Sequence, residues 1–270
     1  MSVFQPGLLQ GQTAFITGGS SGINFGIARR YAEHGANVAI VARNPEKLEA
    51  ARAALATTGA RILALSADVR DIAAMEKAAA DTRAAFGAID IVVAGAAGNF
   101  MAPAAQMSAN AFAAVVGIDL LGTFNTFRAT LPQLRQPGAR GLVISAPQAV
   151  NPTPLQSHVC AAKAGIEAFI KSAAIEWGPL GMRVNGLSPG GVEGTEGLQR
   201  LSAGGLNAEF AATLPVPRYA SVDEMADMAL VLVTPLTGYM TGHVVALDGG
   251  ISLLGGSYSM AWLRGQGGAA

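Results

Sequence analysis

The sequence predicts an α/β fold in which a single doubly wound parallel sheet carries helices on both faces, forming one domain over residues 1–270. Short runs rich in Val, Ile and Leu alternate with Ala-rich stretches of helical length, and this alternation indicates βαβ units. The apolar runs are nearly uninterrupted, which is typical of strands buried on both faces. The chain is 51% hydrophobic and only 13% charged, enough for a large core and for surface buried between subunits.

Each strand is expected where an apolar run is short and ends in Gly or a polar residue. The strands are expected at 13–17, 37–42, 62–68, 89–95, 141–146, 183–188 and 243–248. Helices are expected between them, from the Gly-rich turn through 27–35 and at 45–57, 73–86, 112–134, about 157–177 and 222–233. Pro45 suits the first turn of its helix, because a proline there loses no hydrogen bond.

Composition excludes several function classes. Eighteen basic and eighteen acidic residues give zero net charge, so no nucleic-acid partner is expected. The single Cys160 rules out an intrachain disulfide framework and is compatible with a reducing compartment. No signal peptide, no apolar run near the roughly 20 residues of a membrane span and no peroxisomal address are recognised, so we expect a cytoplasmic protein.

The stretch TGGSSGINFGIA, residues 17–28, follows the first expected strand and opens the first helix. Glycines there allow a sharp turn and close approach of the backbone to a pyrophosphate, which the helix N-terminus then attracts. The succession of strand, Gly-rich turn and helix predicts a Rossmann-like dinucleotide site rather than a plain Gly-rich turn. The residues expected to hold the phosphates are Gly18, Ser20, Ser21, Gly22 and Ile23.

The end of the second strand bears on the choice of cofactor. NAD enzymes place an acid there for the ribose hydroxyls, whereas this strand ends in Ala42-Arg43. A guanidinium can form forked, charge-assisted contacts with a 2′-phosphate, which favours NADPH. The alternative is that Arg43 is a solvated surface charge.

These motifs together resemble the short-chain dehydrogenase/reductase family over nearly the whole chain. The resemblance lies in the TGxxxGx loop with Asn24 at the usual third glycine, Asp68-Val69, Lys163, Ser188-Pro189-Gly190 and the LDGG of 247–250. It implies that Asp68 and Val69 contact adenine, that Lys163 binds the nicotinamide ribose, and that Thr195 reaches the nicotinamide amide or the pyrophosphate. Gly95 in AGAAG, Pro189 and Gly190 complete the cofactor residues that it implies.

Two of the three catalytic groups of a ketone reductase of this family are absent. The tyrosine expected four residues before Lys163 is Val159, and the expected serine is Ala146, with Ser145 beside it. Valine cannot transfer a proton, so either the chain has lost its activity or the chemistry differs.

Four segments decide between these readings: AAGNF (96–100), IDLLGTFN (118–125), EWGP (176–179) and PGGVEGTEGLQRL (189–201). They closely resemble 2,4-dienoyl-CoA reductases of the peroxisomal type, which also lack the tyrosine. That resemblance implies a catalytic aspartate, matched here by Asp119, acting together with Lys163.

The implied reaction explains why no tyrosine is required. NADPH delivers hydride to C5 of the diene, charge moves to the thioester oxygen, and a proton enters at Cα to leave a 3-enoyl-CoA. Such a site needs an oxyanion stabiliser and a proton source near Cα. Lys163 favours the ionised form of Asp119, so we expect a water held by both residues to be the immediate donor.

Coenzyme A is polyanionic, so cations near the cleft would favour its binding. By resemblance, Arg43, Arg70, Phe100 and Arg200 are candidate contacts for CoA or the acyl chain, although each arginine could equally be a solvated charge. His158 is expected to contact substrate or to pack, with direct catalysis as an alternative.

Residues 194–213 are expected to form a substrate lid, and 251–270 a tail on the surface or in a subunit interface. The resemblance implies a homotetramer, and no metal is expected. Two alternative functions remain open at this point: a reductase of another acyl thioester or ketone, and a non-catalytic NADP(H)-binding protein.

Overall fold

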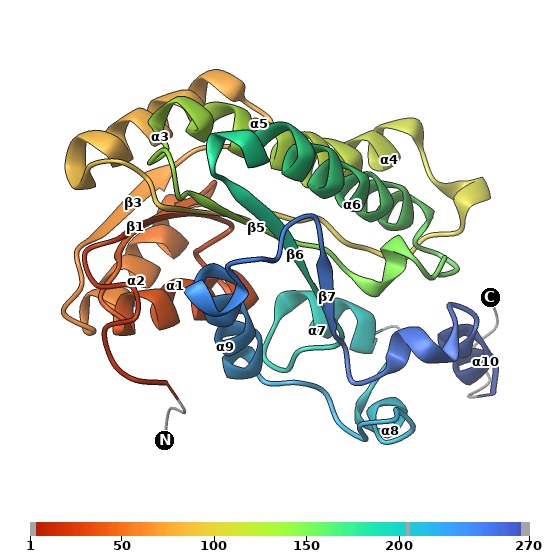
Figure 1. Cartoon of the computed structure of the whole chain (residues 1–270). Coiled ribbons are helices and arrows are strands. Elements are labelled where there is room, and N and C mark those ends of the chain that lie inside the picture. Colours follow the sequence, from red (N-terminus) through yellow and green to blue (C-terminus); the bar gives the residue numbers. More distant parts are fainter. Residues whose placement is uncertain (1–3, 204–205, 266–270) are drawn as a thin grey trace.

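The computed structural model describes residues 4–203 and 206–265 and contains a parallel sheet with helices on both sides (Figure 1). The strand order is β3-β2-β1-β4-β5-β6-β7, and every paired neighbour runs parallel. The strands are β1 Thr13–Thr17, β2 Asn37–Ala42, β3 Ile62–Ser66, β4 Ile91–Ala94, β5 Arg140–Ile144, β6 Arg183–Pro189 and β7 Val244–Leu247. The predicted fold class is therefore confirmed.

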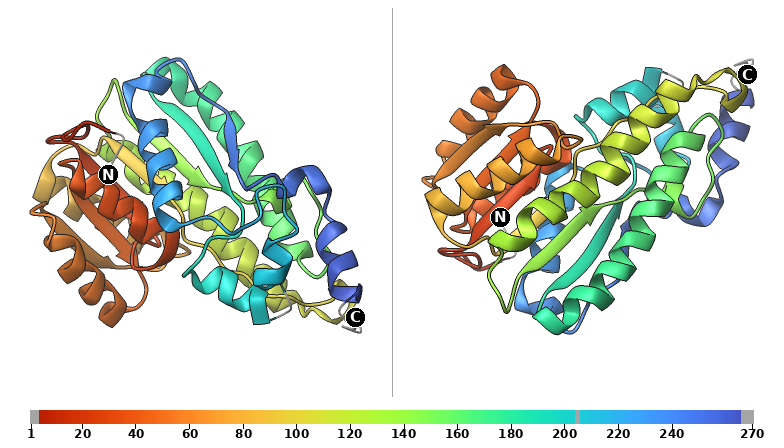
Figure 2. Two further views of the ribbon diagram at one scale, coloured as in Figure 1. Left: turned by 90° about the horizontal axis from the view of Figure 1, so that it is seen from below. Right: turned by 90° about the horizontal axis from the view of Figure 1, so that it is seen from above.

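Two layers of helices cover the sheet, as the views from below and above show (Figure 2). One layer holds α1 Gly22–Glu33, α2 Pro45–Ala56 and α9 Val222–Val233. The other holds α3 Ile72–Phe86, α4 Ala109–Val116, α5 Gly122–Thr130 and α6 Ser157–Trp177. Each layer buries its own core, around Tyr31 and Leu230 on the first face and around Phe15 and Phe127 on the second.

Local signals in the sequence account for where several helices begin. Asn44 caps α2 by accepting a hydrogen bond from the Lys47 amide, and Asp71 caps α3 in the same way. Ser221 and Glu224 form a reciprocal capping box at the start of α9. Helix α1 differs, because its N-cap Ser21 makes no side-chain cap and its first turn carries no acid.

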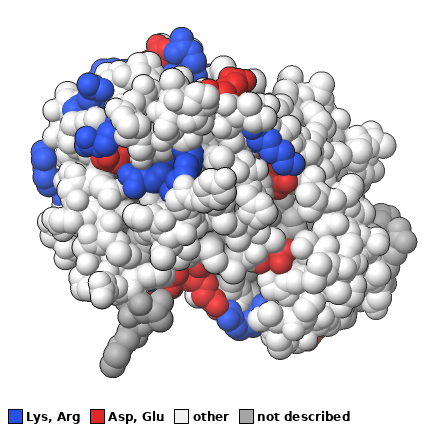
Figure 3. Space-filling view, viewed as in Figure 1, with Lys and Arg blue, Asp and Glu red and all other residues white. Residues whose placement is uncertain are grey.

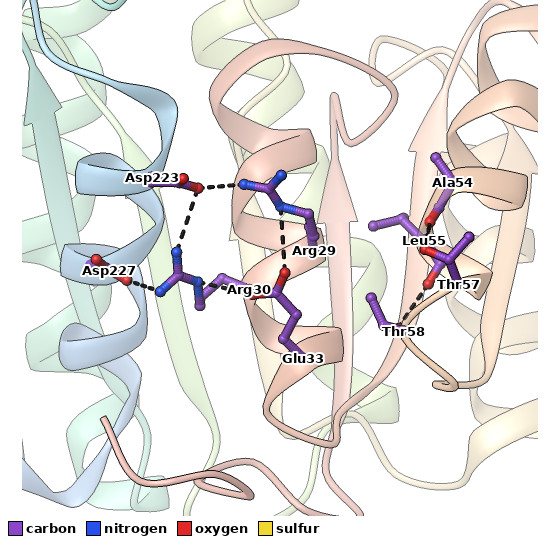
Figure 4. Close-up of polar contacts among 9 residues, drawn as sticks. All are labelled: Arg29, Arg30, Glu33, Ala54, Leu55, Thr57, Thr58, Asp223 and Asp227. Carbon is purple, nitrogen blue, oxygen red and sulfur yellow. Dashed lines mark hydrogen bonds and ion pairs between the residues drawn. The ribbon is translucent and has the colours of Figure 1, made fainter. Parts of the chain in front are cut away.

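Charged side chains join α1 to α9 across the first face (Figure 4). Arg30 forms ion pairs with Asp227 and, at 3.4 Å, with Asp223, and it is largely buried. Arg29 also pairs with Asp223, while Glu33 lies 3.2 Å from Arg30. Because α1 starts at the Gly-rich turn, this network fixes the helix whose N-terminus faces the site.

The helix expected at 112–134 is divided in the structure. A π-helical turn, Gly117–Leu121, separates α4 from α5, and a 3-10 turn, Leu131–Gln133, follows. Glycines at 117 and 122 bound the wider turn, which a 3.6-residue pattern does not reveal. The π turn carries Asp119, consistent with the frequent occurrence of such turns at functional sites.

Two segments of the C-terminal third build one end of the molecule (Figure 1). Helices α7 Glu196–Ala203 and α8 Ala208–Ala211 lie in the predicted lid, and a 3-10 turn Ile251–Leu254 and α10 Tyr258–Gly265 lie in the predicted tail. Phe210 of α8 packs against Tyr258 and Trp262 of α10. Residues 204–205 of the predicted lid and 266–270 of the predicted tail lie outside the described residues.

Candidate active site

A cavity of about 850 Å³ opens at the carboxyl ends of the strands. It lies beside the boundary between β1 and β4, where the strand order reverses and doubly wound sheets bind their ligands. Fifteen of the residues predicted from the sequence line its wall: Gly18, Ser20, Ser21, Gly22, Ile23, Arg43, Asp68, Val69, Gly95, Asp119, Lys163, Pro189, Gly190, Thr195 and Arg200. Arg70, Phe100 and His158 are not part of that wall.

The Gly-rich turn forms the end of the cavity that suits a pyrophosphate. Gly18 has φ +71°, and a Cβ there would lie 3.1 Å from the Ala96 backbone, so glycine is required. The uncapped, acid-free first turn of α1 leaves its amide N–H groups available to an anion. A Cβ at Gly22 would lie 3.6 Å from the Thr195 methyl group, which places Thr195 above the same turn. These features fit a dinucleotide.

Cations surround Asp68 at the end expected to hold the adenosine. Arg70 donates to both oxygens of Asp68, at 2.6 Å for the shorter contact with Oδ2. Arg43 lies 4.0 Å from the same carboxylate and is 62% exposed, so its guanidinium is free to turn toward a ligand. The hydrogen bonds from Arg70 hold the pKa of Asp68 below its ordinary value, and Arg43 adds to that effect.

Asp119 and Lys163 form a buried ion pair in the cavity wall. The Oδ2 of Asp119 lies 3.3 Å from the Nζ of Lys163, and the two side chains are 0% and 7% exposed. Lys163 also donates to the carbonyl of Ile144 at 2.9 Å, and Asp119 Oδ1 accepts the Gly98 amide at 2.7 Å. A buried charge pair is tolerated when further hydrogen bonds complete it, as these do.

Apolar residues occupy the two positions where a ketone reductase of the family that the sequence resembles would have its catalytic tyrosine and serine. Val159 and Ala146 both line the cavity. Ser145, next to Ala146, donates its hydroxyl to Glu167 of α6 at 2.8 Å. Its hydroxyl is therefore directed to a carboxylate on the neighbouring helix.

His158 is fully buried and packs on Phe100, with ring centroids 4.1 Å apart. Neither imidazole nitrogen has a hydrogen-bond partner among the described residues. Burial lowers the pKa of His158, and the charge of Asp119 opposes this shift only in part. A neutral imidazole outside the cavity wall fits the packing role rather than that of an acid.

Among the side-chain amides of the cavity wall that the sequence reasoning missed, three form a hydrogen-bonded chain: Asn99, Gln148 and Gln156. Gln148 donates to Gln156 at 3.0 Å, and Gln156 donates to Asn99 at 2.7 Å. The position of Asn99 just beyond a buried strand is a usable signal, since ligands bind at carboxyl ends of strands. The two glutamines give no local signal, because only the fold brings them together.

Lys47 and Glu196 also border the cavity and were missed. Their side chains form an ion pair at 2.5 Å, joining the first turn of α2 to the first turn of α7. Arg200, one turn further along α7, donates to the carbonyl of Asn99 at 3.2 Å and pairs with Glu196 at 3.4 Å. The predicted lid thus contacts the cavity through charged side chains.

A family model described as enoyl-(acyl carrier protein) reductase matches residues 18–252. A short-chain dehydrogenase/reductase from Serratia marcescens superposes with a TM-score of 0.84 at 29% identity, covering 90% of this chain and 99% of the other. This chain belongs to the short-chain dehydrogenase/reductase family. A family member from Pseudomonas aeruginosa PAO1, described as NADPH-bound with an atypical catalytic center, is 32% identical with a TM-score of 0.83, over 89% of this chain and 96% of that one.

Sequence relatives within this short-chain dehydrogenase/reductase family have more specific names. The peroxisomal 2,4-dienoyl-CoA reductase [(3E)-enoyl-CoA-producing] of Rattus norvegicus is 44% identical over 92% of this chain and 86% of its own length. A probable 2,4-dienoyl-CoA reductase [(2E)-enoyl-CoA-producing] of Bacillus subtilis is 31% identical over 90% and 97%. The oxidoreductase class expected from the sequence is therefore confirmed.

Within the part of the chain that the structure describes, no group of three or more His, Cys, Asp or Glu could hold a metal ion. One helical run of that part, Ala109–Gln133, is long and apolar enough to pass a test for a membrane span by length and composition. That run packs against α3 and α6 in one of the helix layers, so its apolar character has an explanation within the fold.

Proposed function

We propose that this enzyme reduces a 2,4-dienoyl-CoA to a 3-enoyl-CoA with NADPH, in the β-oxidation of unsaturated fatty acids. The observation that carries the proposal is the buried Asp119–Lys163 pair, which lines a cavity where the usual tyrosine position is occupied by Val159. The names of the relatives support this choice of substrate. A site of this kind can donate a proton to carbon, whereas it offers no hydroxyl to a ketone oxygen.

The cofactor would lie along the Gly-rich turn, with its phosphates on the α1 N-terminus and Gly18, Ser20, Ser21, Gly22 and Ile23 around them. NADPH, when bound, would supply the hydride that reaches C5 of the diene. Arg43 is exposed and adjacent to Asp68, where it can form a forked contact with a 2′-phosphate. Lys163 would bind the nicotinamide ribose beside its contact with Ile144.

The remaining cofactor contacts would come from three strand ends and the lid. Asp68 and Val69 would contact adenine, Gly95 would allow close approach of the backbone, and Pro189 with Gly190 would border the nicotinamide. A Cβ at Gly190 would lie 2.8 Å from the Asp248 backbone, so this corner has no room for a side chain. Thr195 would reach the nicotinamide amide or the pyrophosphate from the lid.

The proton would reach Cα through the Asp119–Lys163 pair. Asp119 Oδ1 is occupied by the Gly98 amide, so its Oδ2 and the ammonium of Lys163 are the groups that can hold a water at the cavity wall. That water would donate to Cα as the dienolate collapses. Asp119 then orients the donor, and Lys163 compensates the charge that the water leaves behind.

Charge that develops on the thioester oxygen needs a hydrogen-bond donor, and Asn99 is suited to this role. Its Oδ1 accepts from Gln156, which leaves its Nδ2 hydrogens for a ligand in the cavity. An amide donor in a site that excludes water stabilises an oxyanion strongly.

The CoA moiety would be held by arginines at the cavity mouth. Arg43 and Arg200 line the wall and are more than half exposed, so both can contact phosphates. Arg70 is held by Asp68, and Phe100 packs with His158 behind the wall, so these three predicted substrate contacts would act indirectly.

The part of the surface near α8 and α10 shows almost no charged side chains, as suits an acyl chain (Figure 3).

We also propose that copies of this chain associate, as the resemblance to tetrameric family members implies. Leu121 and Phe124 at the π turn and α5, and Ile175 on α6, are 55%, 48% and 78% exposed. A second copy would cover these apolar side chains. Size-exclusion chromatography with light scattering measures the molar mass in solution and so tests the tetramer. The cytoplasmic location stays a prediction, since several relatives have "peroxisomal" in their names.

The test is NADPH oxidation by the wild-type enzyme with 2,4-hexadienoyl-CoA and, in parallel, with acetoacetyl-CoA. Turnover of the dienoyl thioester, with a 3-enoyl product identified by NMR, is expected. Turnover of the keto substrate alone would replace this proposal with carbonyl reduction. Tight NADPH binding with neither substrate reduced would favour a non-catalytic role.

A further inference from the structure

The three amides of Gln148, Gln156 and Asn99 form a chain with a direction, here called the amide relay. Gln148 Nε2 donates to Gln156 Oε1, and Gln156 Nε2 donates to Asn99 Oδ1. Each amide has one donor end and one acceptor end, so the orientation of one determines that of the next. Asn99 lines the cavity and its Oδ1 is occupied by Gln156, so its Nδ2 is the end of the amide left to donate to a ligand there.

The opposite orientation would have the opposite chemical effect. If Gln156 turned its oxygen toward Asn99, the Asn99 amide would flip to donate to it and would turn its own oxygen to the cavity. That oxygen would repel a negative thioester oxygen. The direction of the relay thus decides whether Asn99 stabilises or destabilises the dienolate.

The backbone around Gln156 is shaped to hold this contact. Gln156 is the N-cap residue of α6, yet its side chain makes no cap and reaches Asn99 instead. The preceding Leu155 has φ +66°, a left-handed conformation that is unusual for leucine and costs free energy. The Leu155 carbonyl accepts the Ala102 amide at 2.9 Å, so this strained turn also fixes the loop that carries Asn99.

The same loop is held from the catalytic side. Asp119 accepts the amide of Gly98, the residue before Asn99, at 2.7 Å. Arg200 of α7 donates to the Asn99 carbonyl at 3.2 Å. With the backbone of Asn99 held by these contacts, its side chain can still rotate about χ1 and χ2, and the hydrogen bond from Gln156 holds the amide in one orientation.

We propose that Gln156, oriented by Gln148, is a positioning residue that turns the Asn99 amide donors toward the thioester oxygen of the substrate. The proposal rests on the proposed function for the identity of that oxygen. Gln156 is 2% exposed and does not need to touch the substrate. Its effect is to select one of two orientations of a neighbouring amide.

Gln156→Glu tests the direction of the relay through its pH dependence. An ionised carboxylate only accepts hydrogen bonds, so it would flip Asn99 and remove the donor. A protonated carboxyl can accept from Gln148 and donate to Asn99 Oδ1, as glutamine does. We expect kcat with 2,4-hexadienoyl-CoA to fall about 100-fold at pH 8, the effect of losing one oxyanion donor. Because position 156 is 2% exposed, burial should raise the pKa of the introduced carboxyl, and kcat relative to wild type should recover about tenfold or more at pH 5.5.

Three variants separate positioning from loss of structure. Gln156→Met should lose activity equally at both pH values, because it cannot be restored by a proton. In an Asn99→Ala background, Gln156→Glu should have no further pH-dependent effect. Gln106→Glu, an exposed glutamine on the 3-10 turn Ala104–Gln106, should behave as wild type. The Kd for NADPH should change less than about twofold in all of these variants.

A readout that needs no turnover is the carbonyl stretching frequency of bound hexanoyl-CoA labelled with 13C at the thioester carbonyl. Relative to the free thioester, this frequency should be lowered when the thioester is bound to wild type. In Gln156→Glu it should be lowered at pH 5.5 but not at pH 8. If wild type reduces the dienoyl substrate and kcat of Gln156→Glu varies with pH as it does in wild type, the relay is wrong and the proposed function stands. If the carbonyl shift follows the relay but no dienoyl thioester is reduced, the relay stands and the function is wrong. A wild type that neither binds nor reduces acyl thioesters would overturn both.

Discussion

The Oδ2 of Asp119 lies 3.3 Å from the Nζ of Lys163, and both side chains are buried in the wall of the same cavity. Asp119 is on a π turn of one helix and Lys163 is on another helix, one turn after Val159. The pair thus places a carboxylate and an ammonium in the wall of the cavity that Val159, at the expected tyrosine position, also lines.

The pair should be coupled in stability as well as in catalysis. Lys163→Met leaves the Asp119 carboxylate buried without its cation, and this should lower the free energy of unfolding by about 3–5 kcal/mol. Adding Asp119→Asn to that variant should restore part of the loss. Urea unfolding of the two single variants and the double variant measures the coupling, and strictly additive effects would contradict it.

Arg43 should determine the preference for NADPH. A charge-assisted hydrogen bond contributes about 1.5–3 kcal/mol, so Arg43→Ala should raise the Kd for NADPH by roughly 10- to 100-fold and change that for NADH little. Arg52→Ala is a matched control, because Arg52 lies on α2 and pairs with Glu49 outside the cavity wall. Equal weakening of both cofactors would show that Arg43 does not contact the 2′-phosphate.

His158 should make the fold sensitive to mild acid. Burial lowers its pKa in the folded state, so the unfolded chain binds more protons below about pH 6.5 and stability falls as the pH falls through that region. His158→Leu should therefore lose less in Tm than wild type between pH 7.5 and 5.5. Equal losses of Tm in His158→Leu and in wild type over this range would contradict the assignment.

The capping box of α9 provides a second test of pH-dependent stability, on a carboxylate and at lower pH. Hydrogen bonds from Arg218 and then Ser221 lower the pKa of Glu224 from 4.5 to about 2. Its contribution is thus fully present above pH 4.5 and is lost as the pH falls toward 2. Glu224→Gln keeps the box and removes the charge, so it should cost roughly 0.5–1 kcal/mol at pH 7 for this partly exposed group. Urea midpoints at pH 7 and pH 3 should show a smaller difference at pH 3; an unchanged difference would assign the loss to packing.

The regular parts of the fold follow from patterns that are local in the sequence. Pro45 lies at the start of α2 as expected, and Asn44, Asp71 and Ser221 with Glu224 are local side-chain caps at the starts of α2, α3 and α9. Bounds differ where the local signal is weak: β3 ends at Ser66 rather than 68, and the helix expected at 112–134 contains a π turn. A wider turn needs support from neighbouring elements, so a pattern of 3.6-residue spacing cannot reveal it.

Some residues of the candidate site could likewise be predicted from the sequence, and others could not. The Gly-rich turn and Arg43 were predicted because each follows a strand, and both line the cavity. The resemblance to known reductases supplied Asp119 and Lys163. Gln148 and Gln156 could not be found, since their meaning lies in contacts made through the fold. His158 was adjacent in sequence to the missing tyrosine, but the helix turns it into the protein, against Phe100.

The measurement that tests the central claim most directly is the rate of 2,4-hexadienoyl-CoA reduction by wild type, Asp119→Asn and Asp119→Ala, together with the Kd of each for NADPH. If Asp119 orients the proton donor, kcat should fall by about 10²–10⁴ in both variants while NADPH binding changes less than about threefold. Variants that retain wild-type turnover, or that lose turnover only in proportion to lost NADPH binding, would contradict it.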